Sequence, residues 1–260
     1  MDLTREYLEF SLKAAGVKPG MLKGMKSGTR CVPRLGWAGD LPGAGTGGGT
    51  GAYLAIDPGW AFPTGSPNPT SQGKMDGAVA LCKKIKGDVV IGVDGDGDRM
   101  VFGDKRGILT AGFVTVPVLK SAGVGGHGKA RGKKGPESVL YDPKVSPLAL
   151  AEWGKLGVQP VLFRNGHSQI KDYMRQISAP AAAEESGHYY HQITMGKLSV
   201  WSENSIMTVL FFLKALAQDR GLMDQLWALQ NQVFTRASLI MNLPTMWCVI
   251  RRWQQWCVIL

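Results

Sequence analysis

Hydrophobic residues follow helical spacing in some segments of this chain and form short apolar runs in others. Near the N-terminus, apolar side chains recur at helical spacing until Gly16 and Pro19, which are typical of a helix end. The residues with this spacing are Leu3, Tyr7, Phe10 and Ala14. In the middle of the chain, the apolar run over residues 89–93 predicts a buried strand.

The second half of the chain alternates between the two patterns. Strands are predicted over residues 139–141 and 158–163, with a helix over 148–156 between them and the start of another helix over 170–176. Alternation of this kind indicates a sheet flanked by helices.

A further helix is predicted from apolar residues at positions i, i+3, i+4 and i+7, a stripe that packs a core rather than binding a cofactor. The stripe consists of Ile206, Val209, Leu210, Leu213 and Ala217. Ser202 and Ser205 are the candidate N-caps of this helix.

Composition limits the size and location of the protein. A chain of 260 residues with 44% hydrophobic content can bury one large or two medium cores. The longest apolar stretch, residues 206–213, is far shorter than a bilayer crossing, so we expect a cytoplasmic protein with no membrane contact. The cysteines form no Cys-x-x-Cys pair and are expected to be free thiols. They are Cys31, Cys82, Cys248 and Cys257.

The candidate chemistry lies directly after the apolar run 89–93. Asp94, Asp96 and Asp98 alternate with glycines that permit a tight loop, and their oxygens suit one divalent cation. Two such carboxylates about 4 Å apart repel by roughly 4 kcal/mol at an effective dielectric constant near 20, so a cation would stabilise the loop. Arg99 follows with a planar guanidinium that suits phosphate. We therefore predict phosphoryl chemistry at a metal site.

Three other kinds of acidic loop offer alternative interpretations of residues 94–99. An EF-hand needs Gly at loop position six and Glu at position twelve, where this chain has Arg99 and Lys105. A solvated acidic turn without a ligand is the simplest alternative. A haloacid-dehalogenase-type phosphatase also places Asp-x-Asp after a strand and stays open, although Asp98 stands where such sites usually carry Thr or Val.

Residues 87–99 resemble the metal-binding loop of the α-D-phosphohexomutases, the phosphomannomutase and phosphoglucomutase family. Segments 67–69, 140–146, 164–171 and 184–188 resemble four further elements of that family, in the family's order. The last of these resembles the sugar-recognition loop Gly-Glu-x-Ser-Gly-His. The resemblance implies an α/β protein made of two mixed-sheet domains flanked by helices, the family's second and third domains.

The resemblance divides the chain into parts. Residues 1–128 are expected to form the second domain and residues 136–235 the third, joined by a basic, Gly-rich linker over 129–135. Two segments, 27–51 and 236–260, depart from the family pattern, and our hypothesis for both is a shifted reading frame. Translating the coding DNA in its other frames tests that hypothesis.

By resemblance, the full reaction interconverts the 1- and 6-phosphates of mannose or glucose. Asp94, Asp96 and Asp98 would hold Mg²⁺ beside a phosphoserine that donates the phosphoryl group. Arg99 would neutralise the charge of the moving group. Arg164 occupies a position where the family usually has Lys, so a cationic role near the substrate is retained.

The same resemblance assigns sugar contacts to the loop 184–188. Glu184 and Ser186, with Gly187 beside them, would bind the ring hydroxyls, and His188 would shuttle a proton. Without the resemblance, Glu184 and its neighbour Glu185 would be surface charges. His188 would belong to an aromatic strand whose imidazoles are satisfied by the backbone. His167 is expected to orient its loop rather than react.

The phosphoserine loop of the family's first domain and the phosphate-binding loop of its fourth domain have no counterpart in this sequence. We therefore expect a fragment that is inactive alone, with a non-catalytic metal- and sugar-phosphate-binding remnant as the alternative. The formal charge of +10 suits a phosphorylated sugar. Nucleic-acid binding is not expected, because the basic run 129–134 has no interleaved aromatic residues.

Overall fold

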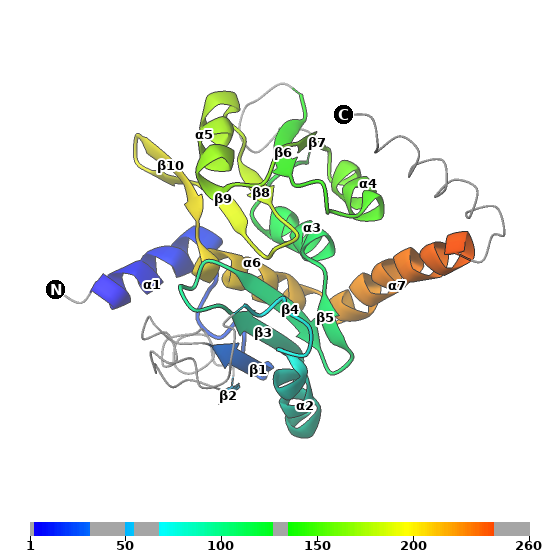
Figure 1. The fold of residues 1–260 in the computed structure, drawn as a ribbon. Coiled ribbons are helices and arrows are strands. Elements are labelled where there is room, and N and C mark those ends of the chain that lie inside the picture. Colours follow the sequence, from blue (N-terminus) through cyan, green and yellow to red (C-terminus); the bar gives the residue numbers. More distant parts are fainter. Residues whose placement is uncertain (1–2, 32–49, 55–67, 127–134, 242–260) are drawn as a thin grey trace.

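The structure, a computed structural model, describes residues 3–31, 50–54, 68–126 and 135–241. Two five-stranded sheets lie in two lobes, with helices around and between them (Figure 1). This confirms the predicted fold class, an α/β protein with two mixed sheets flanked by helices. No helix in these described ranges is long and apolar enough to cross a membrane.

The first sheet has the strand order β2-β1-β3-β4-β5. Strands β2, β1 and β3 are parallel, while β3, β4 and β5 pair antiparallel. The bounds are β1 (Lys26–Cys31), β2 (Thr50–Leu54), β3 (Val89–Val93), β4 (Met100–Asp104) and β5 (Gly107–Leu109). Helix α2 (Asp76–Ile85) packs on β1 and β3. All residues of β3 are buried, as its apolar run predicts.

The second sheet has the order β10-β9-β8-β6-β7 and repeats the same arrangement. Strands β7, β6 and β8 are parallel, while β8, β9 and β10 are antiparallel. The bounds are β6 (Glu137–Tyr141), β7 (Val158–Leu162), β8 (Ala181–Ala183), β9 (Tyr189–Met195) and β10 (Leu198–Glu203). In both sheets the central strand, β3 or β8, is the one where parallel pairing changes to antiparallel pairing.

Four helices lie where the periodicity of the sequence predicts them: α1 (Leu3–Ala15), α4 (Pro147–Lys155), α5 (His167–Ile177) and α6 (Ser205–Gln218). Helices α3 (Ala111–Ser121) and α7 (Leu222–Met241), like α2, were not predicted. Helices α3 and α6 pack on each other between the sheets, and α1 packs on α6. The predicted N-cap of α6 was wrong: Asn204 caps the helix, accepting a hydrogen bond from the Met207 amide at 2.9 Å.

The segment that departs from the family pattern begins with a strand in the structure. Strand β1 lies between β2 and β3 although its sequence, Lys-Ser-Gly-Thr-Arg-Cys, contains no apolar run. A Cβ at Gly28 would lie 3.1 Å from the Ala78 carbonyl and from the Cys82 Cβ, so glycine permits α2 to pack closely on β1. At the other end of the chain, α7 continues through residue 236 to Met241. Residues 32–49, 129–134 and 242–260 lie outside the described parts.

Candidate metal and sugar-phosphate site

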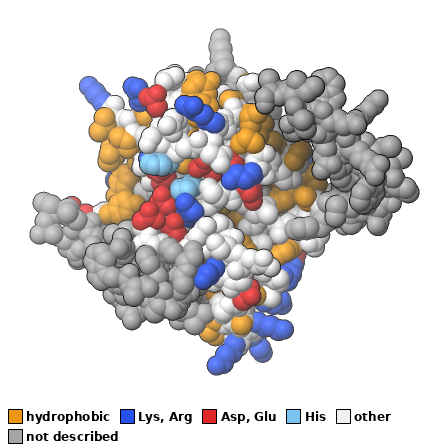
Figure 2. All heavy atoms as spheres, in the orientation of Figure 1, with side chains coloured by type: hydrophobic (Ala, Val, Ile, Leu, Met, Phe, Trp, Pro, Cys, Tyr) orange, Lys and Arg blue, Asp and Glu red, His pale blue; other side chains and the backbone are white. Residues whose placement is uncertain are grey.

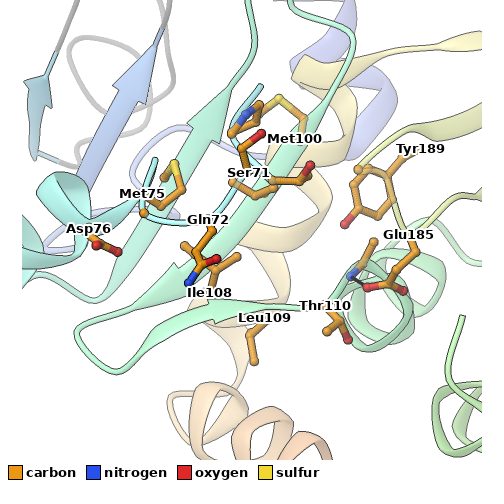
Figure 3. A pocket seen from close by; sticks show the side chains of 16 residues that line it. Ser71, Gln72, Met75, Asp76, Met100, Ile108, Leu109, Thr110, Glu185 and Tyr189 are labelled. Carbon is orange, nitrogen blue, oxygen red and sulfur yellow. Dashed lines mark hydrogen bonds between the residues drawn. The ribbon is translucent and has the colours of Figure 1, made fainter. Parts of the chain in front are cut away.

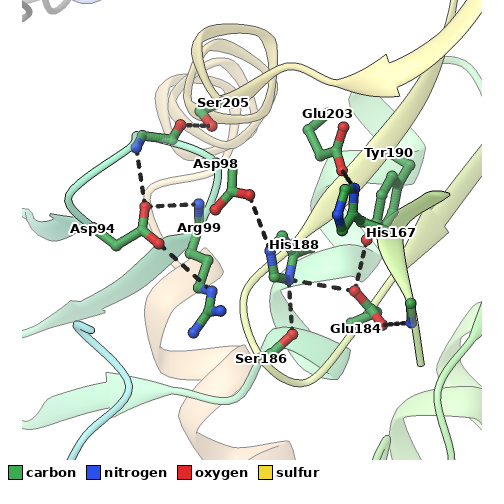
Figure 4. A network of polar contacts seen from close by, with 12 residues as sticks. Asp94, Asp98, Arg99, His167, Glu184, Ser186, His188, Tyr190, Glu203 and Ser205 are labelled. Atoms are coloured by element: carbon green, nitrogen blue, oxygen red, sulfur yellow. Dashed lines mark hydrogen bonds and ion pairs between the residues drawn. The ribbon is translucent and has the colours of Figure 1, made fainter. Parts of the chain in front are cut away.

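The candidate metal loop connects the central strand of the first sheet to the antiparallel strand beside it. It leaves the buried strand β3 at Asp94 and enters β4 at Met100. Gly97 has φ +80°, a conformation that favours glycine, and this turns the loop back on itself. The Asp94 Oδ1 accepts hydrogen bonds from the backbone amides of Gly97 and Arg99, both at 3.1 Å (Figure 4). The loop is therefore folded around the first of its carboxylates.

The three carboxylates fit a hard divalent cation. Asp94, Asp96 and Asp98 each offer an oxygen, and these oxygens all lie within 4.8 Å of one another. Asp94 is buried, and burial raises its pKa from 3.8 to about 7, with further increases from the charges of Asp98 and Asp96. The negative charges of these clustered carboxylates repel one another, and a bound cation would stabilise them.

The candidate sugar turn occupies the equivalent place in the second sheet, between the central strand β8 and its antiparallel neighbour β9. Two backbone bonds close it: the Glu184 amide donates to the His188 carbonyl at 2.9 Å, and the Gly187 amide donates to the Glu184 carbonyl at 3.0 Å. This turn and the metal loop follow topologically matching strands of their sheets.

Backbone contacts join the two loops directly. The Met100 amide donates to the Gly187 carbonyl at 2.8 Å, and Arg99 pairs with His188 in an isolated antiparallel bridge. Gly187 has φ +94°, and a Cβ there would lie 2.9 Å from the Met100 carbonyl oxygen. A larger residue at this position would separate the loops. The structure thus brings together the two segments that the sequence singled out.

His188 lies between carboxylates of the two loops (Figure 4). Its Nε2 is 3.3 Å from the Asp98 Oδ2, while its Nδ1 is 2.9 Å from the Ser186 Oγ and 3.3 Å from the Glu184 Oε2. Side chains therefore contact this imidazole, contrary to the alternative of a backbone-satisfied histidine. His191 differs: it is buried, its Nε2 is 2.8 Å from the Thr208 Oγ1, and burial lowers its pKa to about 4.

Glu184 is buried rather than a surface charge. Its side chain is 5% exposed, and its Oε2 accepts a hydrogen bond from the Tyr190 hydroxyl at 2.6 Å. Burial and this carboxylate together raise the pKa of Tyr190 well above its ordinary value. Tyr190 also stacks on His188, with ring centroids 6.2 Å apart. Tyr190 therefore orients two of the predicted sugar-site residues, a role that no sequence pattern indicated.

Glu185 stabilises a helix. Its carboxylate accepts hydrogen bonds from the amides of Ala111 at 3.0 Å and Gly112 at 3.2 Å, at the first residues of α3. The N-cap Thr110 makes no side-chain capping bond, so Glu185 supplies the cap from a distant part of the chain. Burial raises the pKa of Glu185.

The two candidate cations, Arg99 and Arg164, differ in how close they lie to the contacts of His188 and Glu184. The Arg99 Nε is 3.5 Å from the Asp94 Oδ2, and its side chain is 35% exposed. Arg164 is exposed and lines a separate hollow beside the stacked rings of Phe163 and Tyr173. The loop that carries Arg164 contacts the network through the Gly166 amide, 3.4 Å from the Glu184 Oε1.

His167 begins α5, and its side chain is 63% exposed. Its Nδ1 lies 3.9 Å from the Glu203 Oε1, and Lys171 makes a 2.8 Å ion pair with the same carboxylate. These contacts tie the start of α5 to β10. They agree with an orienting role for His167.

A cavity of about 320 Å³ opens beside the sugar turn (Figure 3). Glu185, Gly187 and Tyr189 line one side, and residues 69–73 line the other. Met75, Met100 and Ile108 also line the cavity. On the surface of the molecule, acidic and histidine side chains gather where the lobes meet (Figure 2). The predicted Pro-Asn-Pro element thus ends at the same junction as the metal and sugar loops.

Comparisons with known proteins agree with this arrangement. A family model for the α/β/α domain II of phosphoglucomutase/phosphomannomutase matches residues 54–107, and the model for domain III matches residues 124–233. Together they cover more than half of the chain. The metal loop lies in the first match and the sugar turn in the second.

Curated relatives match the same part of the chain. A phosphomannomutase of Vibrio cholerae is 35% identical over 130 residues, which are 50% of this chain and 26% of the relative. A protein of Xanthomonas campestris described as phosphohexose mutases is 34% identical over 134 residues, 52% of this chain and 28% of the relative. The matched residues thus span about a quarter of the length of these relatives.

Solved structures share the fold. A phosphoglucomutase/phosphomannomutase family protein from Burkholderia thailandensis has a TM-score of 0.65 at 20% identity, covering 88% of this chain and 46% of that protein. The phosphoglucomutase parafusin from Paramecium has a TM-score of 0.61 at 19% identity, covering 86% of this chain and 41% of that protein.

Proposed function

The chain belongs to the phosphoglucomutase/phosphomannomutase family, and we propose that it forms the metal- and sugar-binding part of a phosphohexomutase. Such an enzyme interconverts the 1- and 6-phosphates of a hexose, here mannose or glucose. One observation carries the proposal: the Asp-rich loop and the Glu-Ser-Gly-His turn, far apart in sequence, meet through the Arg99–His188 bridge and the 3.3 Å contact of His188 with Asp98.

In this proposal Asp94, Asp96 and Asp98 hold Mg²⁺ through their carboxylate oxygens. A bound Mg²⁺ would supply positive charge that neutralises a phosphoryl group in transfer. Arg99 adds a guanidinium that is anchored at Asp94 yet one-third exposed, so it is available to phosphate oxygens. Exposed Arg164 contributes a second cation at the edge of the substrate site.

The sugar turn binds the hexose ring. Glu184 accepts hydrogen bonds from ring hydroxyls in an orientation fixed by Tyr190, and Ser186 exchanges hydrogen bonds with neighbouring hydroxyls. Gly187 lets the turn approach β4 closely. His188, which lies within 3.3 Å of both Asp98 and Glu184, takes a hydroxyl proton at its imidazole.

Turnover requires a phosphoryl donor as well as these binding groups. The resemblance assigns that donor to a serine loop of the family's first domain, and the matched residues 54–107 and 124–233 belong to domains II and III. We therefore expect the 260-residue chain tested alone to bind without turning over. The family match favours this proposal over the haloacid-dehalogenase-type phosphatase.

Calorimetry on the purified chain tests the proposal. We expect Mg²⁺ to bind, and mannose 1-phosphate or glucose 1-phosphate to bind more tightly when Mg²⁺ is present. The double substitution Asp96→Asn with Asp98→Asn should abolish Mg²⁺ binding, because it removes two of the clustered carboxylates. The matched control Asp172→Asn removes an exposed carboxylate of α5 and should leave binding unchanged.

Three results would contradict the proposal. Folded protein that binds neither Mg²⁺ nor either hexose phosphate would overturn the assignment of the site. Interconversion of the 1- and 6-phosphates by this chain alone, with Mg²⁺ and a bisphosphate activator, would overturn the requirement for a separate donor. Release of inorganic phosphate that is lost in Asp94→Asn would instead support a phosphatase.

A further inference from the structure

Helix α6 contacts the metal loop through one side chain. Ser205, the first residue of α6, is 6% exposed, and its hydroxyl donates a hydrogen bond to the carbonyl oxygen of Gly97 (Figure 4). Gly97 lies in the segment that matches domain II of the family and Ser205 in the segment that matches domain III. This contact therefore connects the two segments at a point separate from the sugar turn.

Gly97 links the Ser205 hydroxyl to the three carboxylates of the metal loop. It lies between Asp96 and Asp98 in the sequence, and its amide donates to the Asp94 Oδ1 at 3.1 Å. Its carbonyl belongs to the peptide that continues into Asp98. With the amide held by Asp94 and the carbonyl held by Ser205, the orientation of residue 97 is fixed from both sides.

Ser205 is itself held in place. Asn204 caps α6, so the hydroxyl of Ser205 is not needed for capping and points to the loop. The following side chains of α6 are buried in the core shared with α1 and α3. A donor on a rigid, buried helix positions its acceptor better than a donor on a loop does.

We propose that Ser205 is a positioning residue for the metal site. Its hydroxyl holds the Gly97 carbonyl so that the peptide between Gly97 and Asp98 has a single orientation, and the carboxylates of Asp96 and Asp98 converge on one cation. This inference rests on the proposed metal binding of the three aspartates. It adds that the affinity of the loop for a cation depends on a side chain from the segment that matches domain III.

The test measures Mn²⁺ affinity by electron paramagnetic resonance on the full 260-residue chain, with Mn²⁺ as the probe for a hard divalent cation. Ser205→Ala should weaken Mn²⁺ binding by about threefold to tenfold, the range expected for the loss of one hydrogen bond. Ser205→Thr keeps the hydroxyl and should stay within about twofold of the parent. The matched control Ser202→Ala, in the nearby strand β10, should leave the affinity unchanged.

Amide hydrogen exchange in metal-free protein separates positioning from general stability. Ser205→Ala should speed exchange at residues 97–99 while leaving exchange in the centre of β3 unchanged, because only the loop loses a restraint. If Ser205→Ala does not fold, Ser205→Cys replaces the strong donor by a weak one of similar shape and carries the same expectation.

Each outcome is decisive. Parent protein that binds no Mn²⁺ would overturn the proposed metal function itself. Parent protein that binds Mn²⁺, with Ser205→Ala unchanged in affinity, would overturn only the positioning role. Equal loss of affinity in Ser205→Ala and Ser205→Thr, or equal acceleration of exchange throughout β3, would show that Ser205 acts through packing and would also overturn the role.

Discussion

At the scale of single residues, the metal loop contains carboxylates whose burial and mutual repulsion lower the stability of the metal-free protein. Asp94 lies at the end of a fully buried strand, beside two other carboxylates, and it is held there by the amides of Gly97 and Arg99. Its raised pKa means that the carboxyl group holds its proton more tightly in the folded, metal-free protein than in the unfolded chain. A residue kept in such a place costs stability, which is typical of a binding site rather than of a structural ion pair.

The pKa of Asp94 predicts how stability depends on pH. The group has a pKa near 4 when unfolded and about 7 when folded, so the penalty is absent below pH 4, grows as pH rises to 7 and is complete above 7. Asp94→Asn keeps an acceptor oxygen and loses the charge. We expect it to stabilise the metal-free protein by about 2–4 kcal/mol at pH 8 and hardly at all at pH 4.

Urea denaturation in EDTA at several pH values checks this. Asp96→Asn is the control, since Asp96 is exposed in the same loop and should give a much smaller gain. Saturating Mg²⁺ should reverse the order of stability, because it stabilises only the parent. A gain for Asp94→Asn that is constant from pH 4 to pH 8 would contradict the assigned pKa.

At the scale of elements, the metal loop and the sugar turn occupy equivalent positions in their two sheets. Each leaves the central strand of its sheet where pairing changes from parallel to antiparallel, and each enters the antiparallel neighbour through the residues that bridge the lobes, Arg99 and His188. The sugar turn also caps helix α3 through Glu185. One short turn therefore contacts β4, α3 and its own sheet, and its shape is coupled to all of them.

The cap predicts a measurable stability effect. Glu185→Ala should destabilise the protein by about 1–3 kcal/mol, because two amides of α3 lose their acceptor in a partly buried place. Glu185→Gln keeps one acceptor oxygen and should cost less than half as much. Chemical denaturation at neutral pH measures both, and equal costs for the two variants would show that packing rather than capping is responsible.

At the scale of the whole molecule, the lobes share one core. A single cluster of buried apolar residues includes Ile91 and Phe102 of the first sheet, Val139 and Tyr189 of the second, and Phe212 of α6. Phe102 lies 4.5 Å from Phe212 and 6.3 Å from Tyr189 between ring centroids. The family domains that the sequence matches separately are thus packed as one body in this chain.

A shared core predicts cooperative unfolding. We expect calorimetry to record a single transition for the metal-free chain, with equal calorimetric and van't Hoff enthalpies. Phe102→Leu should lower the stability by about 1–3 kcal/mol and move that transition without splitting it, because the ring contacts both lobes. Two separated transitions, in the parent or in the variant, would show that the lobes fold independently.

Local pattern was sufficient for much of the fold. The buried run of β3, the helical spacing of α1 and the stripe of α6 lie where the hydrophobic periodicity predicts them, because burial of one face determines each element. The alternating Asp and Gly of residues 94–98 likewise predicted clustered oxygen ligands from spacing alone. Strand β1 was missed, because its polar and small residues form no apolar run and the close packing of Gly28 on α2 is not visible in the sequence.

Residue types and their spacing are therefore sufficient to tell which residues carry charge, which faces are apolar and which short loops are tight. They do not tell that the metal loop faces the sugar turn, that Glu184 is buried against Tyr190 or that Ser205 reaches Gly97. These contacts join residues far apart in the chain. Their formation depends on how two sheets and a buried helix pack, and no local periodicity records that packing.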